Sequence, residues 1–158
     1  MSIENVRLFL AKFGREQDVM EFTVSSATVE LAAEALSCQP AHIAKTMSFA
    51  DGDGCLVVVT AGDTKIDNQK YKQTFGFKAK MLSFDQALEM TGHAVGGVCP
   101  FAVKEGVTVY LDKSMKRFDT VFPAAGSAGS AVKLTCDELY ESSQAAEWVD
   151  VCKIPENE

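Results

Sequence analysis

Lys45 and the pair Gly96-Gly97 are the residues whose types could support acyl or phosphate chemistry. A lysine ammonium offers three donors and a point charge that suits a phosphate or a developing oxyanion. Glycines have no Cβ, so successive backbone N–H groups can approach a substrate oxygen closely. From the residues alone, a solvent-facing lysine on a strand edge and a glycine bulge explain the same sequence. Both interpretations stay open at this point.

A second candidate site pairs the thiol of Cys99 with the imidazole of His93, six positions away. Such a pair would support a thiol-dependent hydrolase of small esters, with the imidazole acting as the base. The alternative is a small buried thiol beside a histidine at a helix end. We favour this alternative, because cysteine is among the most buried residue types and no third residue marks an orienting partner for the imidazole.

The cysteines and histidines argue against a metal centre. Neither a C-x-x-C pair nor an H-E-x-x-H motif occurs, and no Walker-type G-x-x-x-x-G-K is present. His42 and His93 are the only histidines. We therefore expect reduced thiols, no metal and no organic cofactor. The five cysteines are Cys38, Cys55, Cys99, Cys136 and Cys152.

The charge distribution is uneven. A net charge of -7 opposes wholesale nucleic-acid binding, because an acidic surface repels a phosphate backbone. Positive charge is nevertheless concentrated between residues 65 and 80, which hold five lysines against one aspartate. Lys113, Lys116 and Arg117 form a second basic group. These groups are either phosphate-binding patches or solvated faces, and the charge pattern alone leaves both interpretations open.

The length and apolar content are ordinary for one small domain. With 158 residues, 47% of them apolar, we expect a single domain over residues 1–154 and a disordered tail over residues 155–158. No stretch approaches the roughly 18 to 20 apolar residues that span a bilayer, and the N-terminus lacks the pattern of a secretion signal. We expect a cytoplasmic protein without membrane contact.

Hydrophobic periodicity and capping signals predict irregularly alternating helices and strands. An early hairpin, with its turn at Asp51-Gly52-Asp53-Gly54, favours a mixed sheet over a fully parallel one. The predicted helices cover residues 2–13 and 29–36, a segment with Tyr71 and Phe75, and segments opened by the capping boxes Ser83-x-x-Gln86 and Thr135-x-x-Glu138. A short turn or helix is predicted at Pro40. The predicted strands cover residues 20–24, 45–49, 56–59, 77–82, 107–111, 120–122, 132–134 and 148–151.

Three blocks carry a family resemblance: His42-Ile43-Ala44-Lys45-Thr46, Gly96-Gly97-Val98-Cys99-Pro100, and the glycine-rich stretch from Gly126 to Leu134. In order and spacing they resemble the family of YbaK and the editing domain inserted in bacterial prolyl-tRNA synthetases. The resemblance implies an α/β domain with a central mixed, barrel-like sheet flanked by helices. It also implies hydrolysis of mischarged tRNA, with release of a small amino acid, and the absence of metal motifs makes this a metal-independent reaction.

The resemblance also implies roles for particular residues. Lys45, Gly96 and Gly97 take the catalytic positions, and Val98 and Pro100 line the substrate site. The further residues expected to contact substrate are Phe22, Thr28, Thr46, His93 and Gly126. The concentration of charge, and not the resemblance, gives the lysines expected to hold the acceptor end of tRNA, which are Lys70, Lys72 and Lys78. An aminoacyl-tRNA synthetase is a further candidate partner.

One departure from the family supports an alternative function. Ala124 and Ala131 stand roughly where YbaK has a serine and an aspartate. A non-catalytic tRNA- or nucleotide-binding module of the same fold is therefore the alternative to a hydrolase. The hydroxyls of Ser127 and Ser130 could contact substrate, although turn formation explains them equally well.

Overall fold

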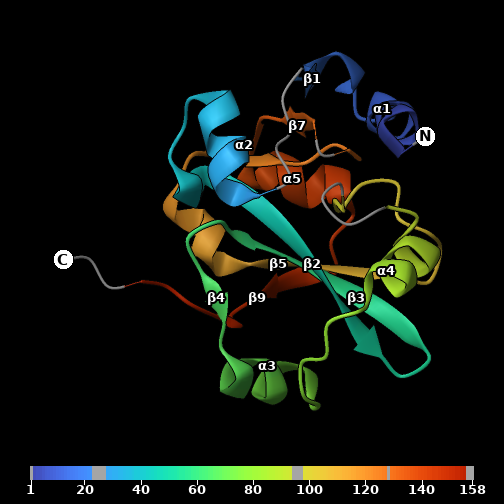
Figure 1. Cartoon of the computed structure of the whole chain (residues 1–158), viewed down its shortest axis with the longest axis vertical. Coiled ribbons are helices and arrows are strands. Elements are labelled where there is room, and N and C mark those ends of the chain that lie inside the picture. Colours follow the sequence, from blue (N-terminus) through green and yellow to red (C-terminus); the bar gives the residue numbers. More distant parts are fainter. Residues whose placement is uncertain (1, 23–27, 94–97, 128, 156–158) are drawn as a thin grey trace.

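The computed structural model describes residues 2–22, 28–93, 98–127 and 129–155, which form a curled mixed sheet surrounded by helices (Figure 1). The six strands of the sheet are ordered β8-β6-β2-β3-β5-β9. The predicted fold class, a mixed α/β domain with a barrel-like sheet, is confirmed. The strand bounds are β2 Ile43–Asp51, β3 Gly54–Ala61, β5 Thr108–Asp112, β6 Thr120–Pro123, β8 Leu134–Thr135 and β9 Glu147–Val149.

The predicted hairpin forms the centre of the sheet. β2 and β3 pair antiparallel from Ala44 opposite Ala61 to Asp51 opposite Gly54. Gly52 in the turn has φ +59°, a left-handed conformation that glycine adopts without steric cost. β5 pairs parallel to β3, and β6 pairs parallel to β2, so the sheet is mixed. The continuous apolar run of β3 fits a central strand covered on both faces.

Alternation along β3 divides the apolar interior into two cores. Val57 points into the larger core, which contains Leu10 and Leu139 from helices near the two ends of the chain. Val58 points to the opposite face and packs in a smaller core with Tyr71. No helix in the described ranges is long and apolar enough to cross a membrane. The helices are α1 (Ser2–Ala11), α2 (Val29–Leu36), α3 (Asn68–Phe75), α4 (Phe84–Thr91) and α5 (Cys136–Ser143).

The capping signals locate the helix starts well. Both predicted capping boxes form, with Ser83 and Gln86 opening α4 and Thr135 and Glu138 opening α5. The first helix ends at Ala11 rather than near Phe13, because the chain there passes into a turn. The predicted helix at Pro40 is the 3-10 helix η2 (Pro40–His42).

Two strand predictions are wrong in detail. Residues 77–82 form only an isolated bridge between Met81 and Phe49, because this segment reaches the edge of β2 over a short stretch. Instead of the single strand predicted at 132–134, the chain forms two strands that pair with different partners. β7 (Ser130–Val132) pairs with β1 (Val19–Glu21), whereas β8 pairs with β6.

Besides the six-stranded sheet and the β1–β7 pair, a further two-stranded sheet was not predicted. β4 (Lys65–Ile66) pairs antiparallel with β10 (Cys152–Lys153). Strands of two residues have no measurable periodicity, so the sequence contains no signal for them. Of the predicted disordered tail, residues 156–158 lie outside the described part of the chain.

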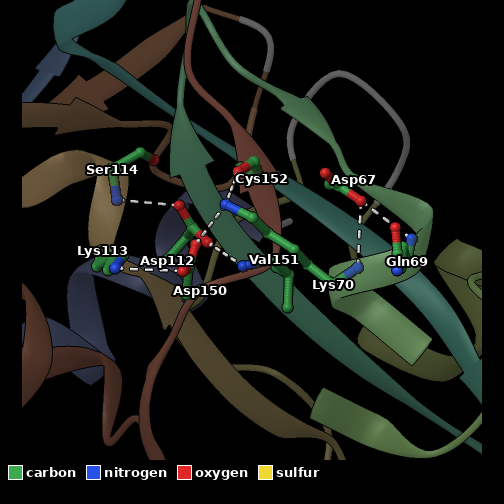
Figure 2. A network of polar contacts seen from close by, with 9 residues as sticks. All are labelled: Asp67, Gln69, Lys70, Asp112, Lys113, Ser114, Asp150, Val151 and Cys152. Atoms are coloured by element: carbon green, nitrogen blue, oxygen red, sulfur yellow. Dashed lines mark hydrogen bonds and ion pairs between the residues drawn. The ribbon is translucent and has the colours of Figure 1, made fainter. Parts of the chain in front are cut away.

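A polar network ties the end of β5 to the C-terminal segment (Figure 2). The buried carboxylate of Asp112 accepts hydrogen bonds from the backbone N–H of Ser114 at 2.9 Å and of Val151 at 2.8 Å. Ser114 belongs to the 3-10 helix η3 (Lys113–Arg117). Both donors are buried and would cost free energy without a partner, so Asp112 fixes η3 against the last strands.

Candidate functional site

A cavity of about 280 Å³ opens beside the unpaired part of the β2 edge. On this edge, β6 pairs only with the first two residues of β2, Ile43 and Ala44. Residues 80–82 return to the same edge further along, through hydrogen bonds with Ser48 and Ala50. Residues 45–47 therefore pair with no described strand on that side. The cavity lies in the gap that this interruption leaves.

The walls of the cavity are mainly apolar and come from segments far apart in sequence. Helix α2 forms one wall, the segment before and at the start of α4 forms another, and β6 with the following turn and β7 forms a third. The polar side chains at the cavity are few. The apolar lining residues are Val29, Ala32, Leu36, Ile43, Ala44, Met47, Met81, Leu82, Phe84, Val98, Phe122, Ala124 and Ala131, and the polar ones are Thr28, Lys45, Thr46, Ser48 and Ser130.

Lys45 is the one charged residue among the described lining residues. Its ammonium Nζ donates a hydrogen bond to the carbonyl oxygen of Thr64, in the turn that follows β3. Burial disfavours the charged form and lowers the pKa of Lys45 below the ordinary 10.5, while the carboxylates of Asp63 and Glu30 act in the opposite direction. A backbone acceptor thus holds the ammonium of a residue that lines the cavity.

The turn that holds Lys45 is itself braced. Asp63 accepts two hydrogen bonds from the Arg117 guanidinium, at 2.6 and 3.1 Å, and this interaction lowers the pKa of the Asp63 carboxyl. Ser114 Oγ accepts from the backbone N–H of Ala61 at 3.2 Å. Thr64 Oγ1 donates to the Ala61 carbonyl at 2.7 Å. These bonds limit the positions that the acceptor of Lys45 can take.

Gly62 allows this turn to pack closely against the start of β2 and the helices before it. A Cβ added at Gly62 would lie 2.1 Å from the Pro40 carbonyl oxygen, 2.8 Å from Val29 Cγ1 and 3.2 Å from the Ile43 carbonyl oxygen. No real Cβ atom makes contacts as short as the first two. A residue without a side chain is therefore required at this position.

Three of the predicted substrate contacts line the cavity: Thr28, Thr46 and Val98. Thr28 Oγ1 already accepts from the backbone N–H of Leu31 at 3.1 Å and caps α2. Thr46 Oγ1 is buried and has no hydrogen-bond partner among the described residues. Buried polar groups normally have a partner, so this hydroxyl is suited to contact a ligand.

Other predicted contacts do not belong to the described lining. Pro100 and Gly126 are buried, and Gly126 has φ +98° at the start of the turn before β7. The backbone N–H of Phe22 donates to the Gly129 carbonyl at 2.7 Å, next to the β1–β7 pair. Gly96 and Gly97, predicted to be catalytic, lie outside the described residues.

Cys99 and His93 come together inside the core. Cys99 Sγ lies 3.7 Å from His93 Nε2, and Nε2 lies 2.7 Å from the Phe101 carbonyl oxygen. Burial lowers the pKa of His93, so the ring is neutral and Nε2 carries the proton donated to that carbonyl. Burial also raises the pKa of Cys99 to about 12. The imidazole nitrogen near the thiol is thus a donor, and the geometry does not favour a thiolate.

The three lysines predicted to bind tRNA differ in their surroundings. Lys70 Nζ on α3 donates to Asp150 Oδ1 and to the Cys152 carbonyl oxygen, both at 3.1 Å (Figure 2). Lys72 on α3 and Lys78 after it are exposed. Lys70 therefore connects α3 to the C-terminal segment, whereas the other two side chains face solvent.

The second basic group is also engaged in contacts. Lys113 Nζ pairs with Asp150 Oδ2 at 3.2 Å. Lys116 Nζ lies 4.4 Å from the centre of the Trp148 ring, a cation–π contact. Arg117 braces the turn after β3 through its bonds to Asp63. Within the described ranges, no group of three or more His, Cys, Asp or Glu residues could hold a metal ion.

Sequence reasoning found the lysine and missed most of the cavity wall. The apolar side chains of α2 and of residues 81–84 have the same pattern as ordinary core residues, so no chemical signal marks them. Ala124 and Ala131, which depart from YbaK, both line the cavity. The fold and site together define a small α/β domain with an apolar cavity beside an interrupted strand edge and a lysine at its wall.

Comparison with known proteins identifies the family. The family model described as "Aminoacyl-tRNA editing domain" matches residues 23–141. The chain therefore belongs to the aminoacyl-tRNA editing domain family, and the resemblance seen in the three sequence blocks is confirmed.

Individual relatives are consistent with this membership. The uncharacterised protein YwhH of Bacillus subtilis (strain 168) is 54% identical over 154 residues, covering 97% of this chain and 98% of that protein. The proline–tRNA ligase of Lysinibacillus sphaericus (strain C3-41) is 32% identical over 109 residues, covering 68% of this chain and 19% of the ligase. A crystal structure of a "putative trans-editing enzyme for prolyl tRNA synthetase" superposes with a TM-score of 0.87 at 25% identity, covering 96% of this chain and 97% of that one.

Proposed function

We propose that this protein is a free-standing hydrolase that removes a small amino acid from mischarged tRNA. The single observation that supports it most is the cavity beside residues 45–47, with Lys45 among its lining residues, in a chain of the editing family. We further propose that residues 1–154 act as one domain and that the protein works in the cytoplasm. The acceptor end of tRNA is the proposed substrate, and a synthetase is a candidate partner.

The chemistry follows from the groups at the cavity. The aminoacyl ester would lie beside residues 45–47, where the outward backbone N–H and C=O of Thr46 can hydrogen-bond to it in place of a neighbouring strand. Lys45 would stabilise the phosphate of the terminal nucleotide or the oxyanion that forms when water attacks the ester. Thr46 Oγ1 would supply a further hydrogen bond. A vicinal ribose hydroxyl or a bound water would assist, and no cofactor takes part in the proposed reaction.

The apolar wall supports a small, uncharged amino acid as the released product. Burying a charged side chain against this wall without a partner would cost several kcal/mol. Ala124 and Ala131 line the cavity roughly where YbaK has a serine and an aspartate, so they add no polar partner for a charged side chain. A cavity of about 280 Å³ also leaves little room for a large side chain once the ester and ribose are bound.

A binding module without catalytic activity is the second candidate. The observation that favours it is that Lys45 Nζ already has an acceptor in the Thr64 carbonyl. An assay with purified protein separates the hydrolase from the binding module. Each tRNA of a panel is charged with a wrong amino acid, and loss of the ester is followed over time. Hydrolysis of a subset carrying small amino acids is expected. Binding of tRNA without loss of any ester would support the module instead.

Cys99→Ala is expected to retain most of the deacylation activity, because the proposed nucleophile is water and the Cys99 thiol is buried with a raised pKa. Removing a nucleophile commonly lowers the rate far more than removing a packing atom. Single-turnover rates of wild type and variant on one mischarged tRNA provide the measurement. A rate reduction of about 100-fold or more, or an acyl adduct trapped on Cys99, would support the thiol route.

Neutralising Lys72 and Lys78 together is expected to weaken tRNA binding and to reduce its salt dependence. Removing one lysine–phosphate interaction lowers the slope of log affinity against log salt by roughly 0.7 to 0.9. Turnover at saturating substrate should barely change, because uniform binding energy alters KM more than kcat. Filter binding from low to moderate salt provides the measurement.

Two variants serve as comparisons for this test. Lys12→Ala removes an exposed lysine that follows α1 and should leave the slope unchanged. Lys70→Ala is expected to affect stability as well as binding, because Lys70 links α3 to Asp150 and Cys152. If the Lys72 and Lys78 double variant keeps the parent's slope, the segment is a solvated face and does not contact tRNA.

A further inference from the structure

Three large apolar side chains are exposed together at the start of α4. Met81 is 62% exposed, Phe84 is 75% exposed and Leu88 is 51% exposed. Phe84 and Leu88 are four residues apart and so share one face of the helix, and Met81 precedes the Ser83 cap. We call these three residues the apolar ridge. Exposing this much apolar surface without a ligand is unfavourable, and its clustering indicates a binding role.

The apolar ridge forms part of the rim of the cavity. Met81 and Phe84 both line the cavity while remaining largely exposed to solvent. In Figure 1, α4 lies beside the β2–β3 hairpin, and residues of α2 line the same cavity as Phe84. A molecule whose end occupies the cavity can therefore continue over Phe84.

Charge beside the apolar ridge favours a polyanion. Lys78 and Lys80 are exposed and closely precede Met81. The Lys80 carbonyl accepts from the Ala50 N–H at 2.8 Å, so the backbone that carries these lysines is fixed to β2. The exposed carboxylates of Asp85 and Glu89 follow Phe84 and Leu88, each about 100° around the helix axis from the ridge residue before it.

The ridge consists of three residues, whereas a stable protein interface involves about 20 to 30 residues on each partner. A flat aromatic ring with flanking apolar side chains and nearby lysines is instead the arrangement that stacks unpaired nucleic-acid bases and holds their phosphates. We propose that the apolar ridge is a stacking platform for the unpaired bases at the 3′ end of tRNA, with Lys78 and Lys80 contacting the adjoining phosphates. This inference rests on the proposed function, because that function places the 3′ terminal ester in the cavity.

Binding of an uncharged, fluorescently labelled single-stranded RNA with the sequence of a tRNA 3′ end tests the platform without requiring catalysis. Phe84→Ala is expected to weaken binding about fivefold or more, as measured by fluorescence polarisation. Phe84→Tyr retains the ring and should bind within about twofold of wild type. Leu8→Ala removes an equally exposed apolar residue, 72% exposed on α1, and should have no effect. Circular dichroism confirms that each variant folds.

Kinetics on mischarged tRNA give a second measurement. Phe84→Ala should raise KM by a factor similar to the reduction in RNA affinity, with kcat little changed, because stacking holds substrate and transition state equally. RNA affinity that is equal in Phe84→Ala and wild type overturns the platform, whatever the deacylation assays show. Absence of RNA binding by wild type also overturns it. RNA binding that depends on Phe84, in a protein that hydrolyses no ester, supports the platform while refuting the hydrolase.

A protein occupant of the ridge is a distinct outcome. If wild type sediments as a dimer and Phe84→Ala sediments as a monomer, a second copy of the chain covers the ridge. The nucleic-acid proposal is then overturned. Sedimentation of both proteins as the same species, together with the reduced RNA affinity of the variant, supports it.

Discussion

Lys45→Ala is expected to lower the single-turnover rate of deacylation by about 100-fold or more while leaving the fold intact. Lys45 is the one charged residue among the described lining residues, so no other described lining residue can replace its interaction with a phosphate or an oxyanion. The side chain is only half-buried, and its removal should affect stability little. Rapid mixing with one mischarged tRNA and a thermal melt of each protein provide the measurements.

The controls for this variant separate charge from position. Lys65→Ala removes an exposed lysine from β4, directly after Thr64, and should retain full activity. Lys45→Arg keeps the charge and should retain part of the activity, although its broader guanidinium fits a site shaped for an ammonium less well. Unchanged turnover in Lys45→Ala would remove Lys45 from the site.

The pH dependence of the same reaction carries further information. The proposed role needs the protonated ammonium, and burial lowers the pKa of Lys45. The value of kcat/KM should therefore fall as pH rises through this lowered pKa, at a pH below 10.5, after subtraction of spontaneous ester hydrolysis. Lys45→Arg should not show this decline, because an arginine side chain stays protonated throughout this range.

Gly62→Ala is expected to reduce the free energy of unfolding by about 3 kcal/mol or more, a large effect for one methyl group. The added Cβ would meet the Pro40 carbonyl oxygen at 2.1 Å, and a backbone atom cannot move aside as a side-chain end can. The clash should separate η2 and the start of α2 from the turn that holds Lys45. Urea unfolding monitored by circular dichroism provides the measurement.

Gly54→Ala is the matched control for this substitution. Gly54 also lies at an end of β3, but its added Cβ would meet only the Asp51 carbonyl oxygen, at an ordinary 3.7 Å. This variant should stay within about 1 kcal/mol of wild type. Equal destabilisation by both substitutions would contradict the contact that we assign to Gly62 and would indicate a general intolerance of β3 ends.

Much of the fold was predictable because local signals and tertiary structure agree. The Asp51–Gly54 turn and the apolar run after it indicated the central hairpin, and the boxes at Ser83 and Thr135 indicated two helix starts. The family resemblance placed Lys45, which does line the cavity. These features depend on residues close together in sequence, so the sequence shows them directly.

The remaining features depend on contacts between distant segments. Residues 77–82 alternate as a strand does, yet only Met81 forms a bridge with β2. Lys70 was predicted to bind tRNA from its basic neighbours, and its contact with Asp150 joins residues 80 positions apart. The cavity is lined by α2, β2, β6 and α4 residues with no shared motif. Such features require the three-dimensional arrangement, because no local pattern encodes them.

The interruption in the edge of β2 has a consequence for discrimination among amino acids. Three residues of exposed strand are too short for another protein strand to pair with stably, so the gap does not invite aggregation as a long open edge would. In the ligand-free protein, water would be the partner of these backbone groups, because an unpaired N–H or C=O costs free energy. A ligand that replaces this water would be recognised through atoms that every amino acid shares, while the apolar walls would act on its side chain only by excluding what does not fit. Selection in such a site would be a size limit, under which smaller amino acids are admitted with the intended one and are told apart elsewhere.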